Sequence, residues 1–489
     1  MFGRKTIVRG CAFTQTWRKR TSEETVQLSR GTLGAGFAAV TIGGALLALA
    51  GVVFNSFDNP PLAPANPAPA SPTPATVVPA TPAPPTFALA IPAKPVPLKP
   101  ALPLGISPQL YAQAVPPGHE PTAQLAALGE KLFKDKRLSV DDSVACETCH
   151  DPTKGFTDHR GGATSAGVQD QHGQRNAPTV LNAMFQASQF WDGRAPALED
   201  QAKLPILNPV EMGQKSPGDV VAKVAKIQEY SDAFKSLLGR DFTYEDIAAA
   251  IAAFERTQYS ANSPFDSFLA GDPQAVSEAA QRGWALFQGK GRCSSCHAFN
   301  AVSPLFSDQK FHNIGIAAHK QDFAGLARKA LAILRTGDTK QIDELALQTS
   351  YSELGRFLVT KNPADIGAFK SETLRNIGIT GPYMHDGSLA TLWDVMDHYN
   401  KGGVPNPFLD GGMQRLALTE AEIDDLVAFL FTLTDDRFAD FNKAELGRQT
   451  SLKTNRPQRE TDVAEGKKGD LGDIGTNPDL RNPASIGAY

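Results

Sequence analysis

Two short motifs in this chain place cysteine and histidine at the same spacing. They read Cys146-Glu147-Thr148-Cys149-His150 and Cys293-Ser294-Ser295-Cys296-His297. In a C-x-x-C-H motif the two thiols can bond to the two vinyl groups of one haem, and the histidine that follows can ligate the iron. Two copies therefore predict two covalently bound haem c groups, with His150 and His297 as iron ligands, and a role in redox chemistry.

Paired cysteines have two other common roles, and the surrounding sequence argues against both. Two C-x-x-C pairs can bind one structural zinc ion, but such pairs usually lie closer together than these. A single C-x-x-C can be a thioredoxin-like redox pair, which needs a βαβ setting, and no strand-rich pattern surrounds either motif. Because histidine follows directly in both copies, we keep haem attachment as the interpretation.

Composition limits the remaining possibilities. The chain has 489 residues, more than one ordinary domain needs. The formal net charge is -4 and no long basic run occurs in the expected folded part, so nucleic acid is not an expected partner. Four of the five cysteines belong to the haem motifs and the fifth, Cys11, lies near the N-terminus, so we expect no structural disulfide.

An uncharged stretch from Gly31 to Phe54 is long enough to cross a bilayer as one helix. Lysines and arginines precede it, so the positive-inside rule keeps residues 1–30 in the cytoplasm and directs the haem domains to the periplasm. The alternative is a cleaved signal peptide, because Ala48-Leu49-Ala50 resembles a cleavage site. The protein would then be soluble in the periplasm. We favour a single-pass anchor in the cytoplasmic (inner) membrane, since the apolar run continues past that site.

The expected fold is mainly α. Residues 55–118, rich in proline and alanine in most of their length, read as a linker because they cannot bury a core. Beyond it, apolar residues recur at helical spacing, and Thr419 with Glu422 forms a capping box. We expect two cytochrome c-like haem domains, at 119–268 and 269–440, preceded by the transmembrane helix and the linker. A polar C-terminal tail is expected at 441–489.

Several blocks around the haem motifs resemble the bacterial dihaem cytochrome c peroxidases and their relative MauG. The resemblance extends over residues 120–435. The blocks are Leu128-Gly129-Glu130-Lys131-Leu132-Phe133, Arg175-Asn176-Ala177-Pro178-Thr179, Gln189-Phe190-Trp191-Asp192-Gly193-Arg194, Asn208-Pro209-Val210-Glu211-Met212 and Gly381-Pro382-Tyr383-Met384-His385-Asp386-Gly387. The resemblance implies an enzyme that reduces hydrogen peroxide at the first haem, while the second haem stores or relays oxidising equivalents.

The resemblance also implies roles for individual residues. Glu211 matches the family's distal glutamate, which moves protons between the two peroxide oxygens, and Gln201 matches its companion. Trp191 matches a tryptophan that lies between the haems and relays electrons. A calcium ion is expected between the domains, bound by Asn176 and by the backbone carbonyls of Thr380 and Pro382, since hard oxygen donors suit calcium.

Two departures from the peroxidases bear on the mechanism. Many of them carry a histidine that blocks the first haem until the second is reduced, and the position here is Val168; His172 is nearby but out of register. We therefore expect a first haem that is open at rest, with His172 a solvated loop residue or a distal group. The methionine that usually ligates the second haem is replaced by Tyr399, as in MauG, with Met396 and His398 as rivals.

The electron donor separates the remaining hypotheses. A peroxidase would take electrons from a small cytochrome or a quinol pool, whereas a MauG-like oxidase would modify side chains of a partner protein. A non-catalytic electron-carrier cytochrome is the third possibility, and the pairing of Glu211 with Gln201 argues against it.

Overall fold

The computed structural model describes residues 97–300, 303–319, 322–346 and 349–453. The expected cytoplasmic tail, the membrane helix and the linker up to residue 96 lie outside the described residues, as do residues 454–489. In the part that is described, no helix is both long and apolar enough to span a membrane.

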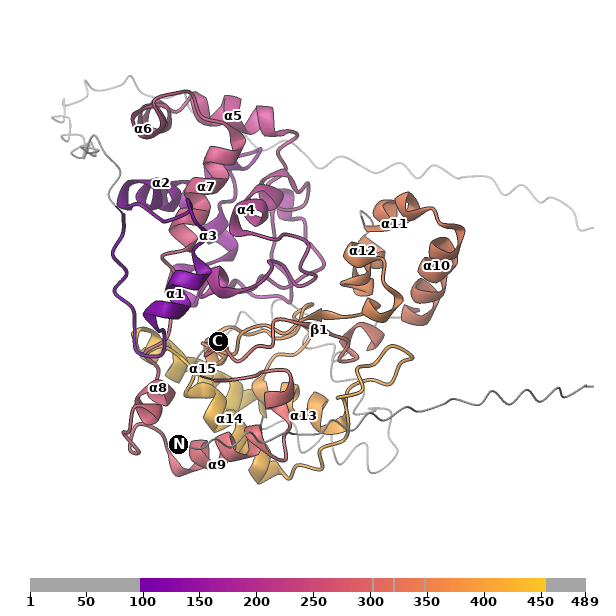
Figure 1. The fold of residues 1–489 in the computed structure, drawn as a ribbon. Helices are drawn as coiled ribbons and strands as arrows, with labels where there is room; N and C mark the ends of the chain where they lie inside the picture. The colour runs from indigo at the N-terminus through magenta and orange to yellow at the C-terminus, as the bar shows by residue number, and fades with distance from the viewer. Residues whose placement is uncertain (1–96, 301–302, 320–321, 347–348, 454–489) are drawn as a thin grey trace, which may run out of the picture. The chain divides into compact units, whose positions relative to one another are not determined.

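Helices form nearly all the regular structure of the described chain, as expected (Figure 1). The strands β1 (Phe311–His312) and β2 (Phe369–Lys370) pair antiparallel and are the only strands found there. The helices are α1 (Pro108–Ala114), α2 (Ala123–Lys134), α3 (Cys146–Cys149), α4 (Leu198–Leu207), α5 (Pro217–Ala225), α6 (Gln228–Leu238), α7 (Tyr244–Glu255), α8 (Pro264–Leu269), α9 (Glu278–Gln288), α10 (Phe323–Thr336), α11 (Thr339–Ala346), α12 (Phe357–Thr360), α13 (Leu392–Lys401), α14 (Glu420–Phe431) and α15 (Ala439–Lys453).

The first hydrophobic core forms where α2 crosses α7, ahead of the first haem motif. Leu128 and Leu132 of α2 are buried there with Phe254 of α7. The helices touch at Gly129, where an added Cβ would lie 1.8 Å from the carbonyl oxygen of Ala250. The crossing therefore requires a residue without a side chain at this position.

The second core repeats this arrangement around α9 and α14. Gly283 of α9 faces α14 so closely that a Cβ would lie 1.9 Å from the carbonyl oxygen of Asp425 and 2.8 Å from Cβ of Phe429. The expected capping box opens α14, because Thr419 Oγ1 accepts from the Glu422 N–H and the Glu422 carboxylate accepts from the Thr419 N–H. Two helix pairs that each cross at a glycine and accompany a haem motif support two related domains.

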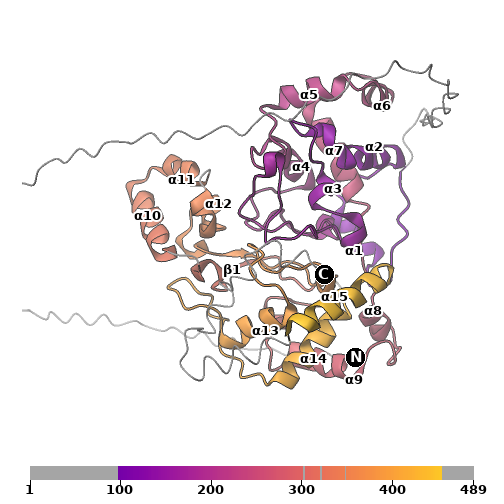
Figure 2. The same cartoon turned by 180° about the vertical axis from the view of Figure 1, so that it is seen from behind.

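A third core, which the sequence did not suggest, lies in an inserted lobe built from α10, α11 and α12, visible in both views (Figure 2). Its buried residues include Phe323, Leu354 and Phe357, and Trp191 of the first domain packs against them. Arg356 of the lobe donates to the carbonyl oxygens of Asp192 and Gly193, both at 2.9 Å. The lobe is therefore fastened to the segment that follows Trp191.

The expected linker ends earlier than residue 118. From Pro97 onward the chain lies against the body: the Leu98 N–H donates to the carbonyl of Pro121, and Asn262 N–H donates to that of Leu104. α1 follows, and its Tyr111 ring meets Tyr259 edge-on with the centroids 5.8 Å apart. The prediction of a linker was wrong for residues 97–118, because aromatic and aliphatic side chains there find partners that proline-rich composition does not reveal.

The expected polar tail was also wrong for residues 441–453, which belong to α15. Gln449 of this helix is fully buried; its amide accepts from the Leu392 N–H at 2.9 Å and donates to the hydroxyl of Tyr383 at 2.9 Å. A helix of polar composition is thus held by buried hydrogen bonds, which hydrophobic periodicity cannot detect.

The boundary between the domains also lies a few residues before 269, since Phe265 of α8 already belongs to the second core.

We predict that Gly129→Val destabilises the haem-loaded protein by about 1–3 kcal/mol or more, because the new side chain must push α2 away from α7. Urea unfolding followed by far-UV circular dichroism measures this. Gly447→Ala in α15 is the control: its Cβ would meet nothing within 4 Å, so the variant should be as stable as the parent or slightly more stable. Equal unfolding midpoints for Gly129→Val and the parent would contradict the tight crossing.

Candidate haem sites

The first haem motif forms a single helical turn that presents its histidine to a buried space. α3 spans Cys146–Cys149, and His150 caps it. The Nδ1–H of His150 donates to the carbonyl oxygen of Phe156 at 3.2 Å, and burial lowers the pKa of the imidazole. With Nδ1 protonated and the ring neutral, Nε2 offers the lone pair that an iron ligand needs. Both cysteines are free, so the residues fit a covalently attached haem.

The second motif repeats this geometry. His297 donates from Nδ1 to the carbonyl oxygen of Phe306 at 2.8 Å, and burial lowers the pKa of its imidazole too. Cys293 and Cys296 are also free. A largely apolar cavity opens beside the motif and is lined by both cysteines, His297 and Tyr399. Covalent attachment, an oriented imidazole and an apolar cavity together fit a second haem c.

Glu211 lies in the loop after α4, close to the first haem motif. The Asn208 side-chain amide donates to its Oε1 at 2.7 Å, and burial raises the pKa of the carboxyl above its usual value, although Arg194 opposes the shift. Burial raises the pKa of the Cys146 thiol, and the Glu211 carboxylate adds to that rise. A half-buried carboxyl beside the haem motif, with Oε2 left for a reacting molecule, can accept and return a proton.

Gln201 lies on α4, two turns before the loop that carries Glu211. Its neighbour Ala202, together with Ile206, packs α4 into the first core, where α4 runs against α7. This packing holds α4 in place beside the first haem motif. Gln201 is half-buried, and its pairing with Glu211 stays a prediction.

The loop that carries a histidine in many peroxidases lies directly against Glu211. Val168 is buried, and its N–H donates to the carbonyl oxygen of Glu211 at 2.9 Å. Gly167 allows this approach, since a Cβ there would lie 2.2 Å from the carbonyl oxygen of Val210. His172 is exposed, and its Nδ1 bonds with the carbonyl oxygen of Thr164 at 3.0 Å. Of the two roles considered for His172, the exposed loop residue agrees with this geometry.

Trp191 lies where the first domain, the inserted lobe and the second haem cavity meet. Its Nε1–H donates to the carbonyl oxygen of Asn176 at 2.9 Å, and its own carbonyl accepts from the Lys370 N–H of β2 at 2.8 Å. The indole also lines the cavity that contains His297. A fixed indole at this junction is consistent with both a packing role and an electron relay.

Two of the three rival ligands of the second haem point into its cavity. Met396 and Tyr399, three residues apart on α13, both line the cavity. His398 is not among the lining residues: its Nε2–H donates to the carbonyl oxygen of Ile314 at 2.8 Å, and burial lowers its pKa to about 4. Met384 and Met413 also line the cavity, and sequence reasoning missed both. Burial raises the pKa of Tyr399, so the phenol would ionise only beside a cation such as ferric iron.

The residues expected to bind calcium come together around the same cavity. Asn176, Thr380 and Pro382 all line it, although they are far apart in the sequence. The Asn176 N–H donates to the carbonyl oxygen of His385 at 2.9 Å, and its amide nitrogen donates to that of Ala163 at 3.1 Å. Among the described residues no group of three or more His, Cys, Asp or Glu side chains could hold a metal ion, so a cation here would rely on amide and backbone oxygens.

A buried carboxyl that the sequence did not mark lies near the first motif. Glu255, at the end of α7, is only 6% exposed, and its Oε2 has no hydrogen-bond partner. Burial raises its pKa to about 8, so the group is mostly protonated at neutral pH. When Glu255 is ionised, its negative charge raises the pKa of the Cys146 thiol further, as that of Glu211 does. Nothing in its sequence context distinguishes it from a solvated helix residue.

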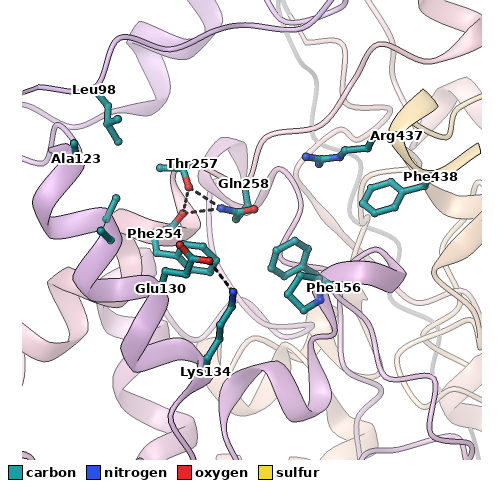
Figure 3. Close-up of a pocket in the computed structure, with 13 residues that line it drawn as sticks. Leu98, Ala123, Glu130, Lys134, Phe156, Phe254, Thr257, Gln258, Arg437 and Phe438 are labelled. Atoms are coloured by element: carbon teal, nitrogen blue, oxygen red, sulfur yellow. Dashed lines mark hydrogen bonds and ion pairs between the residues drawn. The ribbon is translucent and has the colours of Figure 1, made fainter. Parts of the chain in front are cut away.

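A separate groove of about 540 Å³ opens beside the segment that follows the first motif (Figure 3). Phe156, whose carbonyl accepts from His150, lines it together with Phe254. Glu130 and Lys134 of α2 form an ion pair at 2.7 Å on one side, and Arg437 lies on the other. No cysteine or histidine of either haem motif lines this groove, so it is distinct from the haem sites.

Comparison with known proteins agrees with this geometry. Residues 123–274 match the family model of the di-haem cytochrome c peroxidases. The cytochrome-c peroxidase IdrP1 of Denitromonas iodatirespirans is 40% identical over 342 residues, which cover 68% of this chain and 86% of that protein. The methylamine utilization protein MauG of Methylorubrum extorquens is 37% identical over 314 residues, covering 64% of this chain and 78% of that protein.

The fold is also shared with solved structures. The crystal structure of a MauG-like protein associated with microbial copper homeostasis superposes with a TM-score of 0.57 at 30% sequence identity, covering 70% of this chain and 99% of that one. Sequence, fold and the two haem motifs lead to the same assignment. The chain belongs to the di-haem cytochrome c peroxidase family and is a haem peroxidase of that family.

Proposed function

We propose that hydrogen peroxide is reduced at the site of His150 with Glu211 as its acid–base group, and that the site of His297 stores or relays the oxidising equivalents. The observation that carries this division of labour is Glu211: a half-buried carboxyl with a raised pKa lies beside the first haem motif. The cavity of the second motif is instead lined by Tyr399 and Met396, which are potential iron ligands.

At the first site Asn208 holds the Glu211 side chain, and Glu211 transfers the proton. A bound haem supplies the redox chemistry that splits peroxide, provided that its iron keeps a sixth position free. Asn208 occupies Oε1 of Glu211, so Oε2 is the oxygen that takes a proton from one peroxide oxygen and returns it to the other. Gln201 is the proposed companion that orients the peroxide. With two electrons and two further protons, one peroxide yields two water molecules.

Trp191 is the proposed relay between the two sites. Its indole lines the second cavity, and its hydrogen bond to the Asn176 carbonyl fixes the ring. An aromatic ring between two redox centres shortens each electron-transfer step, which is why a tryptophan suits this place. The packing of Trp191 against the inserted lobe is compatible with this role.

We keep Tyr399, which matches the family's ligand position, as the proposed sixth iron ligand. It lines the cavity, as Met396 does, whereas His398 is engaged elsewhere. A tyrosinate is anionic and stabilises higher oxidation states of iron, whereas methionine raises the reduction potential. Tyr399 therefore favours storage of oxidising equivalents, and it supports oxidation of a partner protein, as in a MauG-like oxidase, as the second candidate function. A small cytochrome or a quinol pool would be the donor in the peroxidase alternative.

We further propose that the segment 31–54 anchors the protein in the inner membrane, with the haem sites in the periplasm. The uncharged run and the preceding basic residues support this. Fractionation of cells that make the whole chain tests it: recovery of the protein in the soluble periplasmic fraction would favour signal cleavage.

We predict that Glu211→Gln slows the reaction of the oxidised enzyme with peroxide by about 10²–10⁴-fold, because the amide cannot take up the proton. In the parent the rate should fall as the pH drops through the raised pKa of Glu211, since only the ionised form accepts a proton. The variant should lose this pH dependence. Stopped-flow absorbance of the Soret band measures both quantities.

The matched control for this experiment is Glu245→Gln, which changes an exposed glutamate in the first turn of α7. Its rate and pH profile should equal those of the parent. A Glu211→Gln enzyme that reacts at the parental rate would remove Glu211 from the mechanism.

We predict that peroxide added to the fully oxidised enzyme, without reductant, abolishes the ferric signals of both haems, because Val168 leaves the first haem open. In Tyr399→Met only the first haem should respond, since methionine disfavours high oxidation states. Optical and EPR spectroscopy follow the two haems separately.

His172→Gln serves as the control and should behave like the parent, because His172 is exposed. Trp191→Phe tests the relay, and its second haem should respond more slowly than its first. An enzyme that reacts only after one haem has been reduced would contradict the proposed roles of Val168 and Tyr399.

We predict one tightly held calcium ion per chain in the parent, and its loss in Asn176→Ala, because that variant lacks the side-chain oxygen. Metal analysis after dialysis against a chelator measures the content. Asn300→Ala, which changes an exposed asparagine outside the cavity lining, should retain the ion. Calcium absent from the parent would refute the site.

A further inference from the structure

A histidine outside the haem motifs is held between two carboxylates beside the second haem cavity. His312 on β1 bonds through Nδ1 with Oδ2 of Asp410 at 2.7 Å and through Nε2 with Oδ2 of Asp308 at 2.9 Å. Its side chain is 16% exposed and that of Asp308 is 12% exposed. His312 and Asp410 both line the cavity that contains His297.

The two contacts determine the charge of this histidine. An ionised carboxylate only accepts hydrogen bonds, so both ring nitrogens must carry protons and the ring is an imidazolium. Hydrogen bonding to the Cys296 sulfur, and to Asp410 and Asp308, raises the pKa of His312 to about 10. Once Cys296 is a thioether, the two carboxylates alone hold the charge.

The two carboxylates belong to different parts of the second domain. Asp308 follows the haem motif, and its N–H donates to the carbonyl oxygen of Cys296 at 2.8 Å. Asp410 lies in the connection between α13 and α14, residues 402–418, which we call the cover segment. Its N–H donates to the carbonyl oxygen of Asn313 at 2.9 Å. His312 therefore joins the haem-attachment loop to the cover segment.

The cover segment forms part of the cavity wall. Met413, Gln414 and Leu416 line the cavity together with Tyr399. Arg292, next to Cys293, donates to the side-chain oxygen of Gln414 at 2.6 Å and is a second fastening. The side chains of Asn406 and Asn313 also exchange hydrogen bonds at 3.2 and 3.3 Å, and Phe408 packs against the third core. Several other residues of the segment are exposed.

We propose that His312 is a positioning residue of the second haem site: as an imidazolium between Asp308 and Asp410 it clamps the cover segment over the cavity and closes the second haem to exogenous ligands. The inference rests on the second haem being bound at the Cys293–His297 motif. The clamp would serve the peroxidase reaction, because a closed cavity keeps water and small molecules away from a centre that stores oxidising equivalents.

The test uses imidazole as a probe ligand on the oxidised, haem-loaded, full-length protein. With the first haem saturated, EPR and visible spectra report imidazole binding at the second haem. We expect His312→Gln to bind imidazole there at a concentration about tenfold or more lower than the parent, because two charge-assisted hydrogen bonds no longer favour the closed state. His312→Arg should restore closure, since a planar cation can bridge two carboxylates.

Asp410→Asn removes the negative charge that the cover segment contributes, and it should open the cavity as His312→Gln does. With two variants the test can still be made if one of them fails to load haem. His172→Gln, an exposed histidine of the other domain, should leave imidazole binding at the second haem unchanged. A His312→Gln protein with both haems attached and parental imidazole binding overturns the clamp. Because the readout is ligand binding, its failure is distinguishable from a failure of peroxide turnover.

Discussion

The hydrogen bond from each proximal imidazole to a backbone carbonyl is the interaction on which both sites depend. His150 donates to Phe156 and His297 donates to Phe306, so each ring keeps one nitrogen for iron and has a fixed orientation. The two bonds are made by corresponding residues in two domains whose main helices cross at Gly129 and Gly283. Both domains therefore contain the same structural unit, and in each of them a backbone carbonyl orients the histidine of the haem motif.

The two copies differ in what surrounds them, and the proposed division into a reactive site and a store rests on this difference. Beside the first motif lie the half-buried carboxyl of Glu211 and the buried carboxyl of Glu255, whose pKa values rise because the charged form is poorly solvated there. Beside the second it places Tyr399, Met396 and a clamped imidazolium. Proton transfer needs a group that can change its charge, whereas storage of an oxidising equivalent needs ligands and charges that stay constant.

The junction between the domains is assembled from segments that are distant in sequence. Trp191 from the first domain, β2 and the inserted lobe meet there, and Arg356 holds the lobe to the chain after Trp191. The same region brings Asn176 together with Thr380 and Pro382. Changes in the lobe can thus reach the proposed relay through direct contacts, without altering either haem motif.

The sequence by itself determined the two haem attachment points, the helical class, the capping box that opens α14, and the family. These features rest on local patterns: C-x-x-C-H spacing, a 3.6-residue apolar period and a capping box at Thr419. Glu211, Gln201 and Trp191 came from the family resemblance alone, since a glutamate, an amide and an aromatic residue carry no local signal of such roles.

Only the tertiary structure decided the features that depend on contacts between distant residues. Residues 97–118 and the polar helix α15 pack on the body through partners far away in the chain, so composition misassigned both. The family position favoured Tyr399 over its rivals Met396 and His398. The cavity wall and the bond from His398 to Ile314 argue against His398, whereas Met396 and Tyr399 both line the cavity. His312 had no signal at all, because its charge arises from two carboxylates that only folding brings to either side of its ring.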